Sequence, residues 1–273
     1  MRGENVKAKW VYLNGELIAA DEAAVGVGDR GLLCGDGLYE TIRVRGSRPQ
    51  RMESHLTRLM QGLDVLRMPA ETRVHDYAGA IGQLVIANEM PDARVRITIT
   101  RGNGEKPTIL ITSDTLTPPD PGPVRVIVST YRRDETNPLT RIKTINCLPS
   151  IMAAAEALDH GADDAVMLNT RGNVAEATSA NVFIIEGSRL VTPPVDEGCL
   201  PGTVRETILR LAASVGLEGT EDTVPAKRMR EANAVMLTSA IKLVRLVNEI
   251  DGTAIPEPPT NLALELIAAL DAQ

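Results

Sequence analysis

The chain has 273 residues, of which 43% are hydrophobic and 24% charged, with a formal net charge of -7 and a sequence pI near 5.2. That length is enough for one large domain or two modest ones, each with its own core. The negative charge argues against nucleic acid or an anionic membrane as the main partner. No apolar run reaches the ~18–20 residues that a membrane span needs.

The cysteines and the N-terminus bear on the compartment. Cys34, Cys147 and Cys199 are few, odd in number and widely spaced, which favours a reducing compartment without a disulfide framework. Residues 1–7 lack the apolar core of a signal peptide. We therefore expect a cytoplasmic protein. No group of His, Cys, Asp and Glu has metal-ligand spacing, so no metal is expected.

The first part of the chain predicts strands and helices in alternation. Leucines and a methionine recur at helical spacing from Ser54 to Arg67, and Ser54 can cap the N-terminus of that helix. Gly102 and Gly104 mark a turn between two strand-like runs. In chain order, the expected elements are strands at 10–13 and 40–44, helices at 54–67 and 75–89, and strands at 95–100 and 108–112.

A proline-rich segment at 118–123 divides the chain. Proline at that density cannot continue a helix or an inner strand, so the segment is interpreted as a stiff linker between residues 1–117 and 124–273. Beyond it, the expected elements are strands at 124–128, 165–168, 182–186, 189–192, 234–237 and 243–250, and helices at 150–160, 203–215 and from 261 onward. The sum is a mixed α/β protein with two domains.

Three groups in the second part match the chemical needs of pyridoxal phosphate. Lys143 offers an amine for a Schiff base with the cofactor's aldehyde. Glu176 offers a carboxylate that can keep the pyridine nitrogen protonated. The loop-to-helix entry at 199–205 offers N–H groups and a helix dipole that favour a phosphate. Taken singly, each has a commoner explanation: a solvated lysine, a loop carboxylate and an ordinary helix start.

A series of motifs in the same order resembles the fold-type-IV pyridoxal-phosphate enzymes. This is the class-IV aminotransferase family, which holds D-amino-acid aminotransferases, branched-chain aminotransferases and 4-amino-4-deoxychorismate lyases. The resemblance is carried by residues 29–31 with 35–40, 55–59, the segments around Lys143 and Glu176, Gly202-Thr203 and Thr238-Ser239. It covers about Val11 to Gly252. It implies a smaller N-terminal α/β domain, a larger C-terminal pseudo-barrel domain that binds pyridoxal phosphate, and a homodimer.

The resemblance also implies roles for individual residues. Lys143 is the catalytic lysine, which binds the cofactor and moves a proton between the substrate's α-carbon and the cofactor. Glu176 faces the pyridine nitrogen. The implied phosphate contacts are Arg58, Gly202, Thr203, Val204, Ser239 and Ala240. The chain departs from its relatives at Ala240, where they often carry threonine, and at Leu148, where branched-chain relatives carry tyrosine.

The substrate side is matched less completely. Tyr39 matches a tyrosine of D-amino-acid aminotransferases, Arg96 an arginine of branched-chain enzymes, and Thr41 a threonine of the lyases. Lys242 is a further candidate for binding the substrate carboxylate. The Arg-x-His carboxylate trap of D-amino-acid enzymes, expected just after residues 100–102, is missing.

These matches predict an aminotransferase that exchanges an amino group between an amino acid and a 2-oxo acid. A D-amino acid is the favoured donor, because Leu148 departs from the branched-chain pattern. Three alternatives stay open: a lyase that eliminates pyruvate from aminodeoxychorismate, a branched-chain L-amino-acid enzyme, and a non-enzymatic scaffold. Intact Lys143 and Glu176 argue against the scaffold. Residues 26–31 fit G-x-G-x-x-G but lack the flanking strand and helix, so they predict turns and not a dinucleotide site.

Overall fold

The computed structural model describes residues 8–118, 122–256 and 262–271. Internal contacts divide the chain into two compact units. Unit 1 consists of Met1–Pro118 and Ile142–Asn146, and unit 2 of Pro119–Arg141 and Cys147–Gln273. A short segment far along the chain therefore belongs to the first unit. Residues 119–121 of the expected linker lie outside the described residues.

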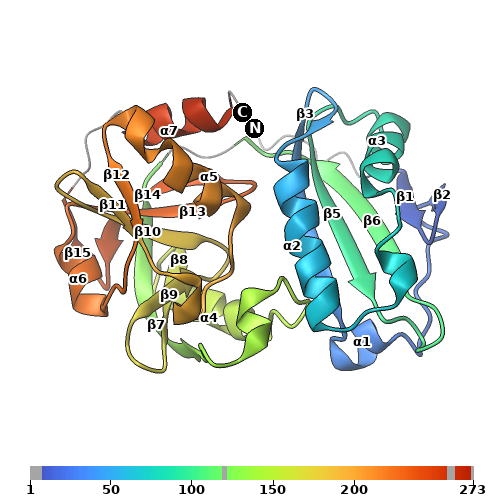
Figure 1. Cartoon of the computed structure of the whole chain (residues 1–273), viewed down its shortest axis with the longest axis horizontal. Coiled ribbons are helices and arrows are strands. Elements are labelled where there is room, and N and C mark those ends of the chain that lie inside the picture. The colour runs from blue at the N-terminus through green and yellow to red at the C-terminus, as the bar shows by residue number, and fades with distance from the viewer. Residues whose placement is uncertain (1–7, 119–121, 257–261, 272–273) are drawn as a thin grey trace. The chain divides into compact units, whose positions relative to one another are not determined.

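The described part of unit 1 is a six-stranded antiparallel sheet with two long helices on one face (Figure 1). Val95, Ile97 and Ile99 alternate along one strand and are fully buried, which is the pattern of a sheet with one face in the core. The sheet order is β2 (Glu16–Ala19), β1 (Trp10–Leu13), β6 (Thr108–Thr115), β5 (Ala93–Thr100), β3 (Gly37–Arg45) and β4 (Arg48–Pro49). The helices are α1 (Arg30–Cys34), α2 (Met52–Val65) and α3 (Tyr77–Ala87).

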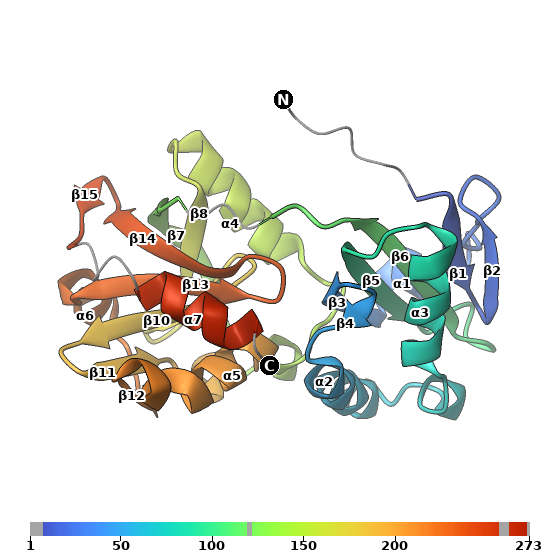
Figure 2. The same cartoon turned by 90° about the horizontal axis from the view of Figure 1, so that it is seen from above.

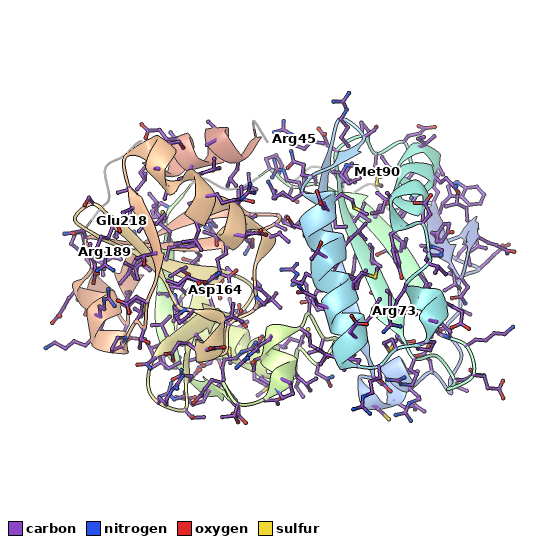
Figure 3. The ribbon with its side chains drawn as sticks, viewed as in Figure 1. Arg45, Arg73, Met90, Asp164, Arg189 and Glu218 are labelled. Atoms are coloured by element: carbon purple, nitrogen blue, oxygen red, sulfur yellow. The ribbon has the colours of Figure 1, made fainter. Side chains whose placement is uncertain are left out.

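The start of α2 corrects one sequence-based expectation. The helix begins at Met52, after Arg51 in the left-handed region at φ 51°, and no side chain caps it. Ser54 lies inside the first turn, so the predicted serine cap is wrong. The chain enters through the tight connection from β4, which starts the helix two residues early. At the other end, Arg73, labelled in Figure 3, donates to the carbonyls of Met68 at 2.8 Å and Leu63 at 3.3 Å.

The described part of unit 2 is built on one large mixed sheet. Its order is β12 (Glu218–Glu221), β11 (Arg189–Thr192), β10 (Asn181–Glu186), β13 (Ala234–Ser239), β14 (Leu243–Ile250), β7 (Val124–Arg133), β8 (Asp164–Asn169) and β9 (Val174–Ala177), with β15 (Thr253–Ala254) beside β14. The sheet curls until its last strand returns towards β10, where the N–H of Ala177 donates to the carbonyl of Ala180 at 2.8 Å. At the opposite end, the register partners Arg189 and Glu218 come from parallel strands (Figure 3).

Helices cover the outside of this curled sheet, and aliphatic side chains fill its inside. Val166, Val182 and Val235 belong to the inner cluster. The alternate residues point outward: Phe183 packs towards α5 (Thr203–Leu211) and α7 (Leu262–Asp271), and Met167 towards α4 (Leu148–Asp159). Figure 2 shows α4 on one side of the sheet and α5 with α7 on the other. The remaining helix, α6, spans Ala226–Glu231.

The elements agree with the predicted mixed α/β class, with differences at three places that matter for the site. β7 continues to Arg133, beyond the predicted end at residue 128, with a register shift between Val128 and Arg132. β9 was not predicted, and it carries Glu176. The helix from Thr203 ends at Leu211 and continues as a 3-10 turn. Among the described residues, no helix combines the length and apolar character needed to cross a membrane.

Candidate active site

Lys143 lies in the short segment that joins unit 1, where it pairs with the start of β3. The N–H of Tyr39 donates to the carbonyl of Lys143 at 2.8 Å, and the N–H of Ile145 donates to the carbonyl of Gly37 at 3.1 Å. Ile142, beside the lysine, is buried. The backbone of Lys143 is therefore anchored to a sheet edge on both sides, so its amine starts from a fixed point in unit 1.

The ring of Tyr39 contacts two cationic side chains. The Lys143 Nζ lies 4.5 Å from the ring centroid and the Arg96 Cζ lies 3.8 Å from it, positions that favour a cation over an aromatic face. Arg96 Nε also donates to the hydroxyl of Thr98 at 3.1 Å. Thr41 is the register partner of Arg96 on the next strand. The structure thus gathers Tyr39, Thr41, Arg96 and Lys143 in unit 1.

Arg58 is held by a buried carboxylate on the other face of β3. Glu40 is 1% exposed, and its two oxygens accept from Arg58 Nε at 2.8 Å and Nη2 at 2.7 Å. His55 Nδ1 lies 2.8 Å from Glu40 Oε2. Burial acts to raise the pKa of Glu40, but the charge of Arg58 and the hydrogen bonds outweigh it and lower that pKa to about 2. Burial lowers the pKa of His55. The plane of the Arg58 guanidinium is therefore fixed.

Glu176 lies on β9 in unit 2 and is 8% exposed. Its Oε2 accepts from the backbone N–H of Leu200 at 2.9 Å. Its Oε1 forms an ion pair with Arg133 Nη2 at 2.5 Å. Both oxygens of this carboxylate therefore have a defined partner, which orients the group. The structure places Glu176 on β9, a strand that the sequence analysis did not predict.

The N-terminus of α5 lies just after the segment that binds Glu176. Gly202 is its N-cap, and no side-chain cap hydrogen bond is made there. An added Cβ at Gly202 would lie 1.9 Å from Asn181 Oδ1, so the backbone approaches this side chain closely. Asn181 Nδ2 in turn donates to the carbonyl of Leu200 at 2.8 Å. Thr203 and Val204, in the first turn, are buried.

The remaining predicted residues of unit 2 lie at the end of β13 and in the turn after it. Ser239 follows Thr238, which is the register partner of Asn181. Ser239 Oγ accepts from the backbone N–H of Lys242 at 3.2 Å, and the side chain of Lys242 is exposed. The Thr238 hydroxyl is buried and has no hydrogen-bond partner among the described residues.

Each unit, taken by itself, offers groups that suit part of pyridoxal phosphate in their chemistry. Unit 1 supplies an amine and an arginine with a fixed guanidinium, and unit 2 supplies a carboxylate and a helix start. The sequence missed two supporting residues. Glu40 had a usable signal, because a carboxylate between Leu38 and Ile42 occupies an inward position of a strand. Arg133 had none, because its partner lies on an unpredicted strand.

Comparison with known proteins agrees with this chemistry. The family described as amino-transferase class IV matches residues 37–250. A Methanocaldococcus jannaschii protein, provisionally named a branched-chain-amino-acid aminotransferase, is 31% identical over 90% of this chain and 89% of its own length. The branched-chain aminotransferase of Thermoproteus uzoniensis, solved with norvaline, superposes with a TM-score of 0.89 at 25% identity, covering 96% of this chain and 93% of that chain. A Legionella pneumophila protein, provisionally named a 4-amino-4-deoxychorismate lyase, superposes with a TM-score of 0.85 at 31% identity, covering 93% and 96%.

The chain belongs to the class IV aminotransferase family. It is a pyridoxal-phosphate-dependent enzyme, and its mixed α/β architecture is that of the fold-type-IV enzymes. The predicted family, fold class, enzyme class and cofactor are thereby confirmed. The D-amino-acid donor stays a prediction.

Proposed function

We propose that the enzyme moves an amino group between an aliphatic L-amino acid and a 2-oxo acid, with Lys143 as its catalytic lysine. Pyridoxal phosphate, when bound, would supply a ring that accepts electrons and an aldehyde carbon that carries the amino group between the two substrates. Lys143 binds the cofactor covalently and carries the proton at its Nζ. The observation that supports this role is the anchoring of Lys143 beside Tyr39 and Arg96.

We assign the other predicted residues to holding the cofactor. Glu176 accepts the ring N–H, which a charged acceptor holds more strongly than a neutral one. The guanidinium of Arg58 and the N–H groups at the start of α5 suit an anion. The proposed phosphate contacts are Arg58, Gly202, Thr203, Val204, Ser239 and Ala240.

Substrate recognition is assigned to the polar face of the unit 1 sheet. Arg96 offers a guanidinium for a substrate carboxylate, and Tyr39 holds that guanidinium in place. Thr41 stands opposite Arg96 in register and offers a hydroxyl. Lys242, exposed in its turn, is a further cation for the same anionic class of substrate. Leu148 stands where branched-chain relatives carry a tyrosine, so it offers the cofactor no hydroxyl at that position.

Two observations support the assignment of the amino donor. Relatives named as branched-chain aminotransferases match over most of the chain. The chain also lacks the Arg-x-His carboxylate trap of D-amino-acid enzymes while keeping Arg96. Leu148 favours the D-amino-acid donor, which is therefore the second candidate. The lyase is the third, favoured by the similarity to the Legionella protein and by Thr41.

A panel of amino acids tests the assignment. The purified holoenzyme is mixed with L-leucine, L-valine, D-alanine or D-glutamate without acceptor, and the cofactor's visible absorbance is followed. We expect L-leucine to bleach the absorbance and 2-oxoglutarate to restore it. Bleaching by D-alanine alone would select the second candidate. Pyruvate release from aminodeoxychorismate without a second substrate would select the third.

We further propose a homodimer in the cytoplasm. The support for the dimer is the family resemblance, and the support for the compartment is the small number of widely spaced cysteines. Sedimentation of the holoenzyme at micromolar concentration tests the dimer. A mass of one chain, near 29.3 kDa, would refute it.

A further inference from the structure

The side chain of Arg133 ties three segments of unit 2 together. It lies at the last position of β7, mostly buried, with Nη2 2.5 Å from Glu176 Oε1 on β9. Its Nε donates to the carbonyl of Gly198 at 3.3 Å, and its Nη2 donates to the carbonyl of Thr140 at 3.4 Å. Planar guanidinium groups suit such multiple contacts because their donors are fixed relative to one another.

The segment after Gly198 supplies the second partner of Glu176. Gly198 is in the left-handed region at φ 91°, and an added Cβ would lie 3.1 Å from Glu135 Cα. Two residues later, the N–H of Leu200 donates to Glu176 Oε2 at 2.9 Å. Arg133 therefore contacts both the carboxylate and the segment that carries its backbone donor.

We infer that Arg133 is a positioning residue, which holds the Glu176 carboxylate aimed at the cofactor's ring nitrogen. This inference rests on the proposed function, in which Glu176 accepts the ring N–H. A carboxylate has about four acceptor positions on its two oxygens. Arg133 faces one oxygen and Leu200 uses one position on the other, so the carboxylate keeps acceptor capacity for the ring.

The low exposure of Glu176 explains why a cationic partner is needed. A buried carboxylate that loses its charged partner turns towards another donor. Such a turn weakens a charge-assisted hydrogen bond to the ring nitrogen. Arg133 supplies the opposite charge from β7, and its carbonyl contacts stop it from following a displaced carboxylate.

A double-mutant cycle on the full-length protein tests the inference. Arg133→Met, Glu176→Gln and the double variant are prepared as apoproteins, and the Kd for pyridoxal phosphate is measured by equilibrium dialysis. Each protein is also reconstituted with cofactor labelled with ¹⁵N in the ring, and the nitrogen's chemical shift reports its protonation. Arg132→Met is the matched control, because Arg132 is the exposed neighbour on the same strand and donates to the Ser129 carbonyl.

We expect Arg133→Met to raise the Kd roughly tenfold and to shift the ¹⁵N resonance towards neutral pyridine. In the Glu176→Gln background the same change should alter the Kd less than about twofold, because the group it positions is already gone. Arg133→Lys keeps the positive charge, so its Kd and its ¹⁵N resonance should lie between those of Arg133→Met and wild type. Arg132→Met should behave as wild type.

Each other outcome decides against one claim. Equal losses from Arg133→Met in both backgrounds would mean that Arg133 does not act through Glu176, and the inference fails. The inference also fails if Arg133→Met has the same Kd and the same ¹⁵N resonance as wild type. If Glu176→Gln changes neither the Kd nor the resonance, then the proposed role of Glu176 fails instead. If Arg133→Met does not fold, Arg133→Lys decides: a loss of affinity of equal size in the wild-type and Glu176→Gln backgrounds would overturn the inference.

Discussion

Unit 1 and unit 2 orient their charged groups by opposite arrangements. In unit 1 the cation of Arg58, the proposed phosphate ligand, is held by the buried carboxylate of Glu40. In unit 2 the anion of Glu176, the proposed partner of the ring nitrogen, is held by Arg133 and a backbone N–H. Lys143 is anchored by its backbone pairing with β3, and its Nζ lies over the Tyr39 ring.

In both units, a charged side chain is oriented by a partner of opposite charge. A buried ion pair adds little net stability, because desolvation offsets the attraction between the charges. Removing one partner is costly, because the other charge is left uncompensated. Residues such as Glu40 and Arg133 are therefore expected to show large effects when changed, although neither is assigned a contact with substrate or cofactor.

The largest expected effect comes from Lys143, the proposed catalytic lysine. In Lys143→Ala we expect turnover to fall at least about a thousandfold, because the amine that binds the cofactor and carries the proton is gone. The fold should persist, since the backbone pairing with β3 does not need the side chain. Borohydride reduction followed by mass spectrometry should find the cofactor attached to wild type only. Lys227→Ala, an exposed lysine on α6, is the control, and retained turnover in Lys143→Ala would refute the assignment.

The next effect tests the buried pair of unit 1. The pKa of Glu40 falls from an ordinary 4.5 to about 2 in the folded protein. A group with a depressed pKa stabilises the fold above its unfolded value and loses that contribution as the pH falls through the folded value. Glu40→Gln should therefore lower the free energy of unfolding by about 3 kcal/mol at neutral pH. The difference should shrink between pH 4.5 and 2.

Urea unfolding of wild type and Glu40→Gln across that pH range measures the effect. Glu53→Gln is the matched control, because Glu53 is an exposed carboxylate at the start of α2. His55, whose pKa is lowered by burial, should cost both proteins stability as the pH falls below its ordinary value of 6.5. A difference between Glu40→Gln and wild type that stays constant from pH 7 to 2 would contradict the ion-pair account.

A smaller effect is expected at the start of α5. In Gly202→Ala the new Cβ would meet Asn181 Oδ1, so Asn181 must move and release the Leu200 carbonyl. We expect the Kd for pyridoxal phosphate to rise by about tenfold, and the stability to fall by about 1–3 kcal/mol. Gly82→Ala is the control, because an added Cβ there meets nothing within 4 Å. Unchanged cofactor binding in Gly202→Ala would remove this turn from the phosphate site.

The sequence predicted the longer helices and strands, because periodicity is a local property, but it missed shorter elements such as β2, α1, β12 and α6. The strand at 10–13 and the hairpin near Gly187 follow from alternation and turn residues. It could not predict that Ile142–Asn146 would join unit 1, because that pairing with β3 joins positions about a hundred residues apart. Such long-range pairing depends on tertiary structure, which single-sequence patterns do not contain.

The sequence analysis proposed the charged groups of the site but not Glu40 and Arg133, the residues that orient them. Lys143 and Glu176 were proposed because their chemistry is specific and their spacing resembles a family, and their roles stay predictions. Arg133 was missed because an arginine near a strand end has many ordinary explanations, and β7 was predicted to end before it. The orienting partner of a charged group is set by the packing of strands, so it is visible only in the folded chain.

The smallest expected effect separates a half-buried charge from an exposed one on the same strand. Arg94 and Arg96 are two residues apart on β5, so they point to the same face. Arg94 pairs with Asp114 at 3.1 Å, with the two side chains 50% and 63% exposed. Exposed pairs of this kind are worth about 0–1 kcal/mol and are screened by salt. Arg94→Ala should therefore change the free energy of unfolding by less than about 1 kcal/mol, and the KM for the 2-oxo acid by less than about twofold.

Arg96→Ala should raise the KM for the 2-oxo acid by about tenfold, because the substrate carboxylate loses the guanidinium that binds it. Equal KM changes in the two variants would mean that the face acts through its total charge, and Arg96 would lose its special role.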